Sequence, residues 1–160
     1  MELLWSPWRL EYVTAGTGDE VECFLCAALA AGDDEASLLV HRTELILTIL
    51  NKFPYNTGHV MIAPIRHVGM LKDLVSEERV AVMDETAHAI EVIGAAMDPH
   101  GFNVGMNLGR VAGAGVPGHL HVHVVPRWGG DTNFMPVVGQ TKVLPEMLAE
   151  TYAKLKPGFS

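Results

Sequence analysis

The segment GHLHVHVVPRW, residues 118–128, decides the fold that we expect for this chain. His119, His121 and His123 occupy every second position, and Leu and Val fill the positions between them. Side chains of a β-strand alternate between its two faces. We therefore expect a half-buried strand over residues 119–126, whose apolar side chains face a core. The three imidazoles would share the opposite face, roughly 7 Å apart.

The segments around this strand predict an α+β domain. The expected strands are residues 37–42, 44–51, 59–67, 102–108 and 119–126, and the expected helices are residues 22–31, 76–97 and 144–155. The expected N-cap of the long helix is Ser76, and its expected apolar stripe consists of Val80, Met83, Ala87, Ile90, Gly94 and Met97. Strands dominate the middle of the chain, which indicates an antiparallel sheet of about five strands with one long helix and short flanking helices.

Length and composition bound the class of protein. The 160 residues, 49% of them hydrophobic, are enough for a single domain over residues 1–160 with a substantial core. The sequence has no apolar run of about 18 residues, so we expect no membrane span. The N-terminus lacks the basic start and apolar core of a signal peptide, and two cysteines are too few for a disulfide scaffold. We therefore expect a cytoplasmic protein.

The charge balance points to a small ligand. The net charge is −8, with only 11 Lys and Arg residues, which argues against a nucleic-acid partner because such partners need clustered cations. A small anion needs only a local site of backbone N–H groups and His side chains. The Gly-rich loop NLGRVAGAGVPG, residues 107–118, could be such a phosphate site or simply a flexible connection.

The three alternating histidines allow several interpretations. A solvated strand face is one. A metal site is another, but a His-x-His pair needs a further ligand, and no carboxylate follows before Asp131. The third is catalysis: a neutral imidazole is a good nucleophile toward phosphorus, and neighbouring imidazoles could bind oxygens or assist the leaving group.

The pair Cys23-Phe-Leu-Cys26 also allows several interpretations. Cys-x-x-Cys is half of a zinc site whose other half must come from elsewhere in the chain. The two residues could equally be small hydrophobes on a buried helix face. A redox pair is the third possibility, although no βαβ pattern follows the motif.

The segment HLHVHVV fits the pattern His-φ-His-φ-His-φ-φ, with φ apolar, and resembles the histidine-triad (HIT) family of nucleotide hydrolases and transferases. Residues 49–74, ILNKFPYNTGHVMIAPIRHVGMLKDL, resemble the hairpin that precedes the triad in that family. Residues 106–137 and the N-terminal WSPWRLEYV resemble its dinucleoside-polyphosphate branch, nearest to the diadenosine tetraphosphate phosphorylase-like proteins of bacteria. The resemblance covers most of residues 5–155.

The resemblance implies an enzyme that cleaves dinucleoside polyphosphates. His121 matches the family nucleophile, which attacks the α-phosphorus and forms a covalent nucleotidyl-histidine, with its other ring nitrogen held by a backbone carbonyl. The acceptor would be water in a hydrolase or phosphate in a phosphorylase, and the resemblance favours the phosphorylase branch. One alternative is an adenosine phosphoramidate-type hydrolase. Another, from a different class, is a nucleotide- or zinc-binding interaction protein with little turnover.

The resemblance also assigns roles to the residues around the nucleophile. The implied nucleotide-binding residues are His123 at the α-phosphate, Asn107 at phosphate oxygens, Asn51 at the ribose, His59 behind the triad, and the backbone from Gly115 to Gly118 at the charge on phosphorus. Many members carry a Gly-Gln-Ser/Thr sequence before the triad, whereas AGAGVPG here offers neither a hydroxyl nor a glutamine. Assistance to the leaving group is therefore the part of the mechanism that the resemblance specifies least.

Relatives that carry zinc imply a structural metal site. The matching positions are Cys23, Cys26, His67 and His119, and two Cys with two His would make a closed tetrahedral set. In that case His119, otherwise a catalytic candidate beside His121, clamps the strand. The resemblance implies no organic cofactor, and it implies a homodimer whose sheets join edge to edge or through the long helix.

The other histidines and the tryptophans match no motif. We expect His88 to be partly buried, and His41 and His100 to be exposed. Trp5, Trp8 and Trp128 are expected to pack in the core or at an interface.

Overall fold

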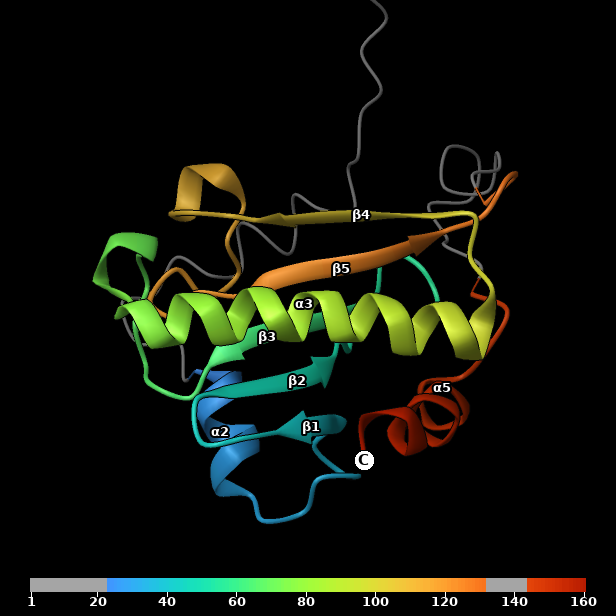
Figure 1. The fold of residues 1–160 in the computed structure, drawn as a ribbon, viewed down its shortest axis with the longest axis horizontal. Coiled ribbons are helices and arrows are strands. Elements are labelled where there is room, and N and C mark those ends of the chain that lie inside the picture. The colour runs from blue at the N-terminus through green and yellow to red at the C-terminus, as the bar shows by residue number, and fades with distance from the viewer. Residues whose placement is uncertain (1–22, 132–143) are drawn as a thin grey trace, which may run out of the picture.

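The computed structural model describes residues 23–131 and 144–160, and it has the predicted α+β architecture (Figure 1). One antiparallel sheet has the spatial order β1-β2-β3-β5-β4. Its strands are β1 (Leu39–Arg42), β2 (Ile46–Leu50), β3 (Val60–Pro64), β4 (Gly101–Met106) and β5 (Val122–Arg127). The helices are α2 (Phe24–Ala30), α3 (Ser76–Met97) and α5 (Leu148–Leu155), with 3₁₀ turns η1 (Leu71–Asp73), η2 (Arg110–Ala112) and η3 (Lys156–Phe159). Trp5, Trp8 and the WSPWRLEYV motif lie outside the described residues.

The long helix α3 runs across one face of the sheet, and α5 and η3 close one end of the same layer (Figure 1). The core between them is built from alternate strand positions. Its sheet side includes Val40, Ile46, Leu50, Val60, Ile62, Val122 and Val124, and its helical side includes Val82, Ala89, Val92, Ile93, Tyr152, Leu155 and Phe159. Within the described ranges, no helix combines the length and the apolar character that a membrane crossing needs.

The opposite face of the sheet carries a second, smaller core under α2. It consists of Leu25, Leu39, Leu47, Ile49, Met61 and Ala63. Met61 pairs with His123 across the β3–β5 ladder, and directly paired residues point to the same face. His123 therefore projects from the sheet face that α3 leaves uncovered.

The bounds of α3 agree with the prediction, but its expected N-cap is wrong, and only Ile90 and Met97 of its expected apolar stripe pack against the core. Val75 is the N-cap, and Ser76 is the first helical residue. Val80 and Met83 of the expected stripe are 56% and 60% exposed. The residues that α3 buries are Glu78, Val82, Glu85, Thr86, Ala89, Val92 and Ile93. Two carboxylates lie on this buried face, so a search for apolar periodicity alone selects a different face.

Strand β5 begins at Val122, three residues later than predicted. Val122 forms the last pair of both neighbouring ladders, opposite Ile62 and Met106. Beyond it the chain leaves the sheet, since the backbone N–H of Leu120 donates to the carbonyl of Val68. The prediction of one strand that holds all three imidazoles is therefore wrong: only His123 lies within the strand, and His119 and His121 lie in the segment that leads into it.

Candidate active site and metal centre

His121 is held in one tautomer by the backbone. Its Nδ1 lies 2.8 Å from the carbonyl oxygen of His119, which can only accept, so Nδ1 carries the proton. The lone pair is then on Nε2. Burial lowers the pKa of His121, against the opposing effect of that hydrogen bond, and the side chain is 5% exposed. His121 is therefore a neutral imidazole near pH 7, with the protonation state that a nucleophile needs.

His123 lies beside His121, with ring centroids 4.9 Å apart, and a chain of hydrogen bonds fixes its tautomer. The backbone N–H of Tyr55 donates to Nδ1 of His59 over 3.0 Å, so the proton of neutral His59 is on Nε2. That Nε2 lies 3.0 Å from Nδ1 of His123 and donates to it. The proton of neutral His123 is then on its Nε2, which makes this atom a hydrogen-bond donor.

The two candidate asparagines lie on opposite sides of these imidazoles. Asn51 has its side-chain nitrogen 3.4 Å from Nδ1 of His59, and its backbone N–H donates to the His59 carbonyl. Asn107 directly follows Met106, the partner of Val122, so it lies at the strand end next to His121. Its side-chain nitrogen donates to the carbonyl of Gly113 over 3.4 Å, which connects it to the Gly-rich loop.

The Gly-rich loop packs against the segment after β3. A Cβ on Gly118 would lie 3.1 Å from Nε2 of His67, and a Cβ on Gly69 would lie 2.5 Å from the carbonyl oxygen of Pro117. The loop thus approaches Gly69 so closely that no side chain fits there, while a Cβ at Gly118 would be tight against the ring of His67. Gly118 adjoins His67 and His119 rather than His121, and Gly115 lies in the bend that precedes it. Sequence reasoning missed Gly69, because a single glycine between Val68 and Met70 gives no signal.

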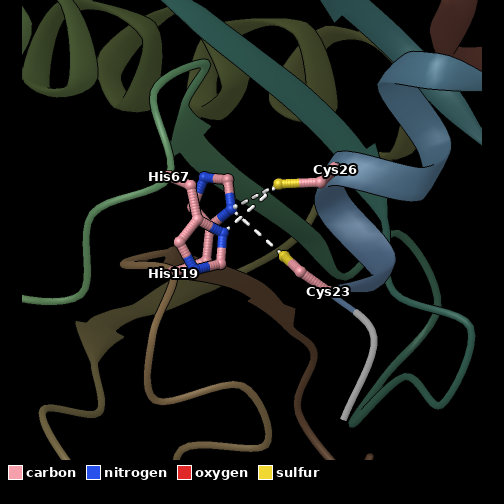
Figure 2. Close-up of side chains that lie close together, drawn as sticks. All are labelled: Cys23, Cys26, His67 and His119. Atoms are coloured by element: carbon pink, nitrogen blue, oxygen red, sulfur yellow. Dashed lines mark hydrogen bonds between the residues drawn. The ribbon is translucent and has the colours of Figure 1, made fainter. Parts of the chain in front are cut away.

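Two cysteines and two histidines converge beside α2 (Figure 2). Cys23 Sγ lies 3.2 Å from Nδ1 of His119, and Cys26 Sγ lies 3.3 Å from Nδ1 of His67 and 3.5 Å from Nδ1 of His119. The four ligand atoms all lie within 4.8 Å of one another. The zinc set expected from the sequence is therefore assembled by segments far apart in the chain.

The donor set and its geometry fit a tetrahedral zinc ion. Zinc lies about 2.3 Å from sulfur and about 2.0 Å from nitrogen, which places its ligand atoms roughly 3.5 Å apart. His119 is fully buried, and its Nε2 donates to the carbonyl of Pro64 over 2.8 Å. The Nδ1 lone pair therefore points at the two sulfurs, and a backbone carbonyl orients the ring as is usual for zinc ligands. Both nitrogens of His119 are engaged, which leaves neither for proton transfer to a substrate.

A scan against family models matches the HIT domain to residues 33–130, more than half of the chain. Among curated proteins, the chain is 42% identical over 159 residues to a protein of Mycobacterium tuberculosis named AP-4-A phosphorylase, covering 94% of this chain and 80% of that protein. It is also 35% identical over 91 residues to the asymmetrical bis(5'-nucleosyl)-tetraphosphatase of Schizosaccharomyces pombe, covering 57% and 50% of the two chains.

Solved structures share the fold. A zinc-bound histidine triad family protein from Mycobacterium smegmatis superimposes with a TM-score of 0.68 at 22% identity, over 86% of this chain and 93% of that one. A histidine triad nucleotide-binding protein from Sulfolobus tokodaii gives a TM-score of 0.67 at 26% identity, over 86% and 89% of the chains. These likenesses agree with the α+β sheet and its long helix.

Proposed function

This chain belongs to the HIT family, and we propose that it is an enzyme that cleaves dinucleoside polyphosphates through a nucleotide bonded covalently to His121. The observation that carries the proposal is the hydrogen bond from Nδ1 of His121 to the His119 carbonyl. It keeps the proton on Nδ1, so that Nε2 can attack phosphorus without a separate general base.

The reaction has two displacements at the same phosphorus. In the first, Nε2 of His121 forms a bond to the α-phosphorus and the bond from that phosphorus to the bridging oxygen breaks. A diadenosine tetraphosphate thereby releases ATP and leaves an adenylyl group on His121. In the second, an acceptor oxygen bonds to the phosphorus, the P–N bond breaks and His121 is restored.

The neighbouring side chains would bind and position the phosphate. His123, with its proton on Nε2, would donate a hydrogen bond to an oxygen of the α-phosphate, and His59 would act behind it as a positioning residue. Asn107 lies at the end of β4 next to His121 and would donate its amide to another phosphate oxygen. Asn51 would bind the ribose, and the backbone of residues 115–118 would stabilise negative charge. Positioning and charge stabilisation are the main aids in such a reaction.

We propose phosphate as the acceptor. The two strains of Mycobacterium tuberculosis each supply a relative that is 42% identical, and both relatives are named AP-4-A phosphorylase. With phosphate the second displacement gives ADP, whereas with water it gives AMP. The products therefore identify the acceptor directly.

The test uses diadenosine tetraphosphate with and without added phosphate. We expect ATP and ADP in the presence of phosphate, and no turnover by His121→Asn at an unchanged melting temperature. His100→Asn is the matched control, since His100 is an exposed histidine whose ring accepts from the backbone N–H of Gly129. AMP formation that is independent of phosphate would reject the phosphorylase. Full activity of His121→Asn, or a wild-type protein that binds nucleotide without turnover, would reject the enzyme.

We further propose that Cys23, Cys26, His67 and His119 hold one structural zinc ion. The fit of the four ligand atoms to tetrahedral spacing supports this. Zinc would join α2 to the segments that flank the Gly-rich loop, and it would supply no catalytic chemistry because all four positions are filled. Two cysteines that form no disulfide agree with the expected cytoplasmic location. Elemental analysis of protein purified without added metal should find about one equivalent.

We also propose a homodimer. Val80 and Met83 on α3 and Val104 on β4 are large apolar side chains that the single chain leaves exposed. Strand β4 is also the outer strand of the sheet, with an edge that no other described strand covers. A second copy that packs on this edge and on α3 would bury both features.

A further inference from the structure

We propose that His41, Glu85 and His88 form a second metal site, for a divalent first-row transition-metal ion. The three side chains come from β1 and α3, and their ligand atoms lie within 4.8 Å of one another. Nδ1 of His41 lies 2.9 Å from Oε1 of Glu85, and Nδ1 of His88 lies 3.5 Å from Oε2 of the same carboxylate. Neither the HIT pattern nor the proposed reaction uses these residues.

The fold directs His41 toward α3 by an irregularity in the sheet. The register between β1 and β2 shifts between Leu39 and His41, so that Leu39 pairs with Ile49 and His41 with Thr48. Leu39 lies in the small core under α2, whereas Thr48 reaches Glu85 on α3. One extra residue in a strand re-aims the following side chain. The shift therefore brings His41 onto the same face as Thr48, which corrects the prediction that His41 is exposed: it is only partly accessible.

The helix supplies the other two ligands at a suitable spacing. Glu85 and His88 are three residues apart, so they lie on the same side of α3 and one turn separates them. Glu-x-x-His on a helix is a known arrangement for transition-metal ligands. Two imidazoles and one carboxylate, with further positions open to water, suit ions such as Zn²⁺, Co²⁺ or Ni²⁺, whereas Mg²⁺ and Ca²⁺ prefer oxygen ligands alone.

The surroundings have two features typical of metal sites, an oriented carboxylate and a path from solvent. The Thr48 hydroxyl donates to Oε1 of Glu85 over 2.5 Å and orients a carboxylate that is only 6% exposed. A hollow of about 450 Å³ opens beside the cluster and gives an ion a path from solvent; its lining residues include His88, Glu91 and Lys154. In the metal-free arrangement Nδ1 of His41 donates to the Glu85 carboxylate, so a metal ion that binds Nδ1 displaces this proton, and the neutral imidazole takes up a proton from water at Nε2 in exchange.

The second site would fasten the C-terminal end to the sheet. The Phe159 ring stacks on His41, with ring centroids 5.8 Å apart, and contacts His88 edge-on at 5.3 Å. The site also lies under α3, on the face of the sheet opposite the Cys/His cluster. The two sites share no residue, so they can be loaded and mutated separately.

The test titrates Co²⁺ into protein already loaded with one equivalent of zinc, followed by calorimetry and by visible absorbance. We expect one further equivalent to bind without the absorbance of cobalt–thiolate bonds, and the melting temperature to rise. His88→Gln and His41→Gln should each weaken this second event at least tenfold, while His100→Gln, at an exposed histidine elsewhere, should bind like the wild type. His88 is 39% exposed, so its replacement should leave the fold intact.

The result is decided by the comparison between variants. Unchanged cobalt binding in both His88→Gln and His41→Gln would overturn the proposal, as would a wild-type protein that binds no second equivalent at millimolar Co²⁺. A second equivalent with a cobalt–thiolate absorbance would also overturn it, because the ion would then be in the Cys/His cluster. Since the readout is metal binding, the result is independent of the proposed reaction.

Discussion

Nε2 of His59 donates to Nδ1 of His123 over 3.0 Å, and the backbone N–H of Tyr55 fixes the donor's tautomer from the other side. A backbone N–H can only donate, so the direction of both hydrogen bonds is determined. The chain therefore sets the tautomer of His123, which would face phosphate, from a backbone amide two hydrogen bonds away.

These two hydrogen bonds predict different effects of two substitutions at His59. His59→Leu removes both hydrogen bonds, and we expect kcat to fall roughly tenfold to a hundredfold with a smaller change in KM, because a positioning residue is lost. His59→Gln can accept from Tyr55 and donate to His123, so it should restore part of the loss. Steady-state kinetics measures both variants. Equal activity of the two would mean that the hydrogen bonds of His59 do not act on the reaction.

Removal of the proposed zinc ion should lower the stability of the fold and disturb the orientation of His121. The carbonyl of His119 accepts from His121, while the ring of the same residue belongs to the Cys/His cluster. We expect Cys26→Ser to lose zinc, to melt at a lower temperature and to lose activity, since the carbonyl that orients His121 is no longer fixed. Metal content, melting temperature and kcat should fall together. Wild-type activity in a variant free of zinc would show that the reaction does not depend on the Cys/His cluster.

The proposed dimer predicts that one charge on the exposed apolar face produces monomers. Met83→Glu places a carboxylate on the accessible side of α3, where it would be buried against a second copy. Light scattering after size exclusion should then give half the mass of the wild-type particle. Val111→Glu is the control, because Val111 is fully exposed and belongs to η2 rather than to α3 or β4. A wild-type monomer at micromolar concentration would contradict the proposal.

The ion pair between Arg66 and Glu78 predicts a dependence of stability on pH. Arg66 donates to both carboxylate oxygens of Glu78 and, with the backbone N–H of Val75, holds the pKa of Glu78 below its usual 4.5, against the opposing effect of burial. A lowered folded-state pKa stabilises the fold above the unfolded value, and this stabilisation disappears as the pH falls through the folded value.

Glu78→Gln should therefore be less stable than the wild type near neutral pH, and the difference should shrink as the pH falls below about 4.5. Urea unfolding across the range in which the protein stays folded measures the difference. Glu77→Gln, at the adjacent exposed position, is the control and should show less dependence on pH. A difference for Glu78→Gln that stays constant or grows on acidification would show that the carboxylate charge has no stabilising role.

Local patterns predicted the elements of the fold better than their orientation. The bounds of α3 and the approximate positions of the strands along the chain follow from periodicity and from turn residues, which act over a few positions. The buried face of α3 does not follow from such patterns, since buried Glu85 has its Oε1 hydrogen-bonded by Thr48 and His41, which come from two strands distant in the sequence. The register shift that turns His41 toward α3 likewise has no local signal.

The candidate site shows the same division. Cys23, Cys26, His67 and His119, assigned from the family pattern, do converge, because that pattern carries long-range information. The alternation of the triad predicted one continuous strand, but His119 turns to the cysteines while His123 stays in the sheet. The spacing of the histidines identified the three imidazoles. Their division between the Cys/His cluster and the sheet depends on tertiary contacts, which no single segment of sequence predicts.

If the proposed reaction is right, His121 is bonded to phosphorus during turnover. The most direct measurement mixes the protein rapidly with diadenosine tetraphosphate, stops the reaction in alkali, where a P–N bond survives, and maps the modified peptide by mass spectrometry. We expect one adenylyl group on His121, appearing with the first ATP released and disappearing when phosphate is added, as ADP forms. Release of ATP and ADP in a single turnover with the adenylyl group on another residue, or on none, would contradict the account.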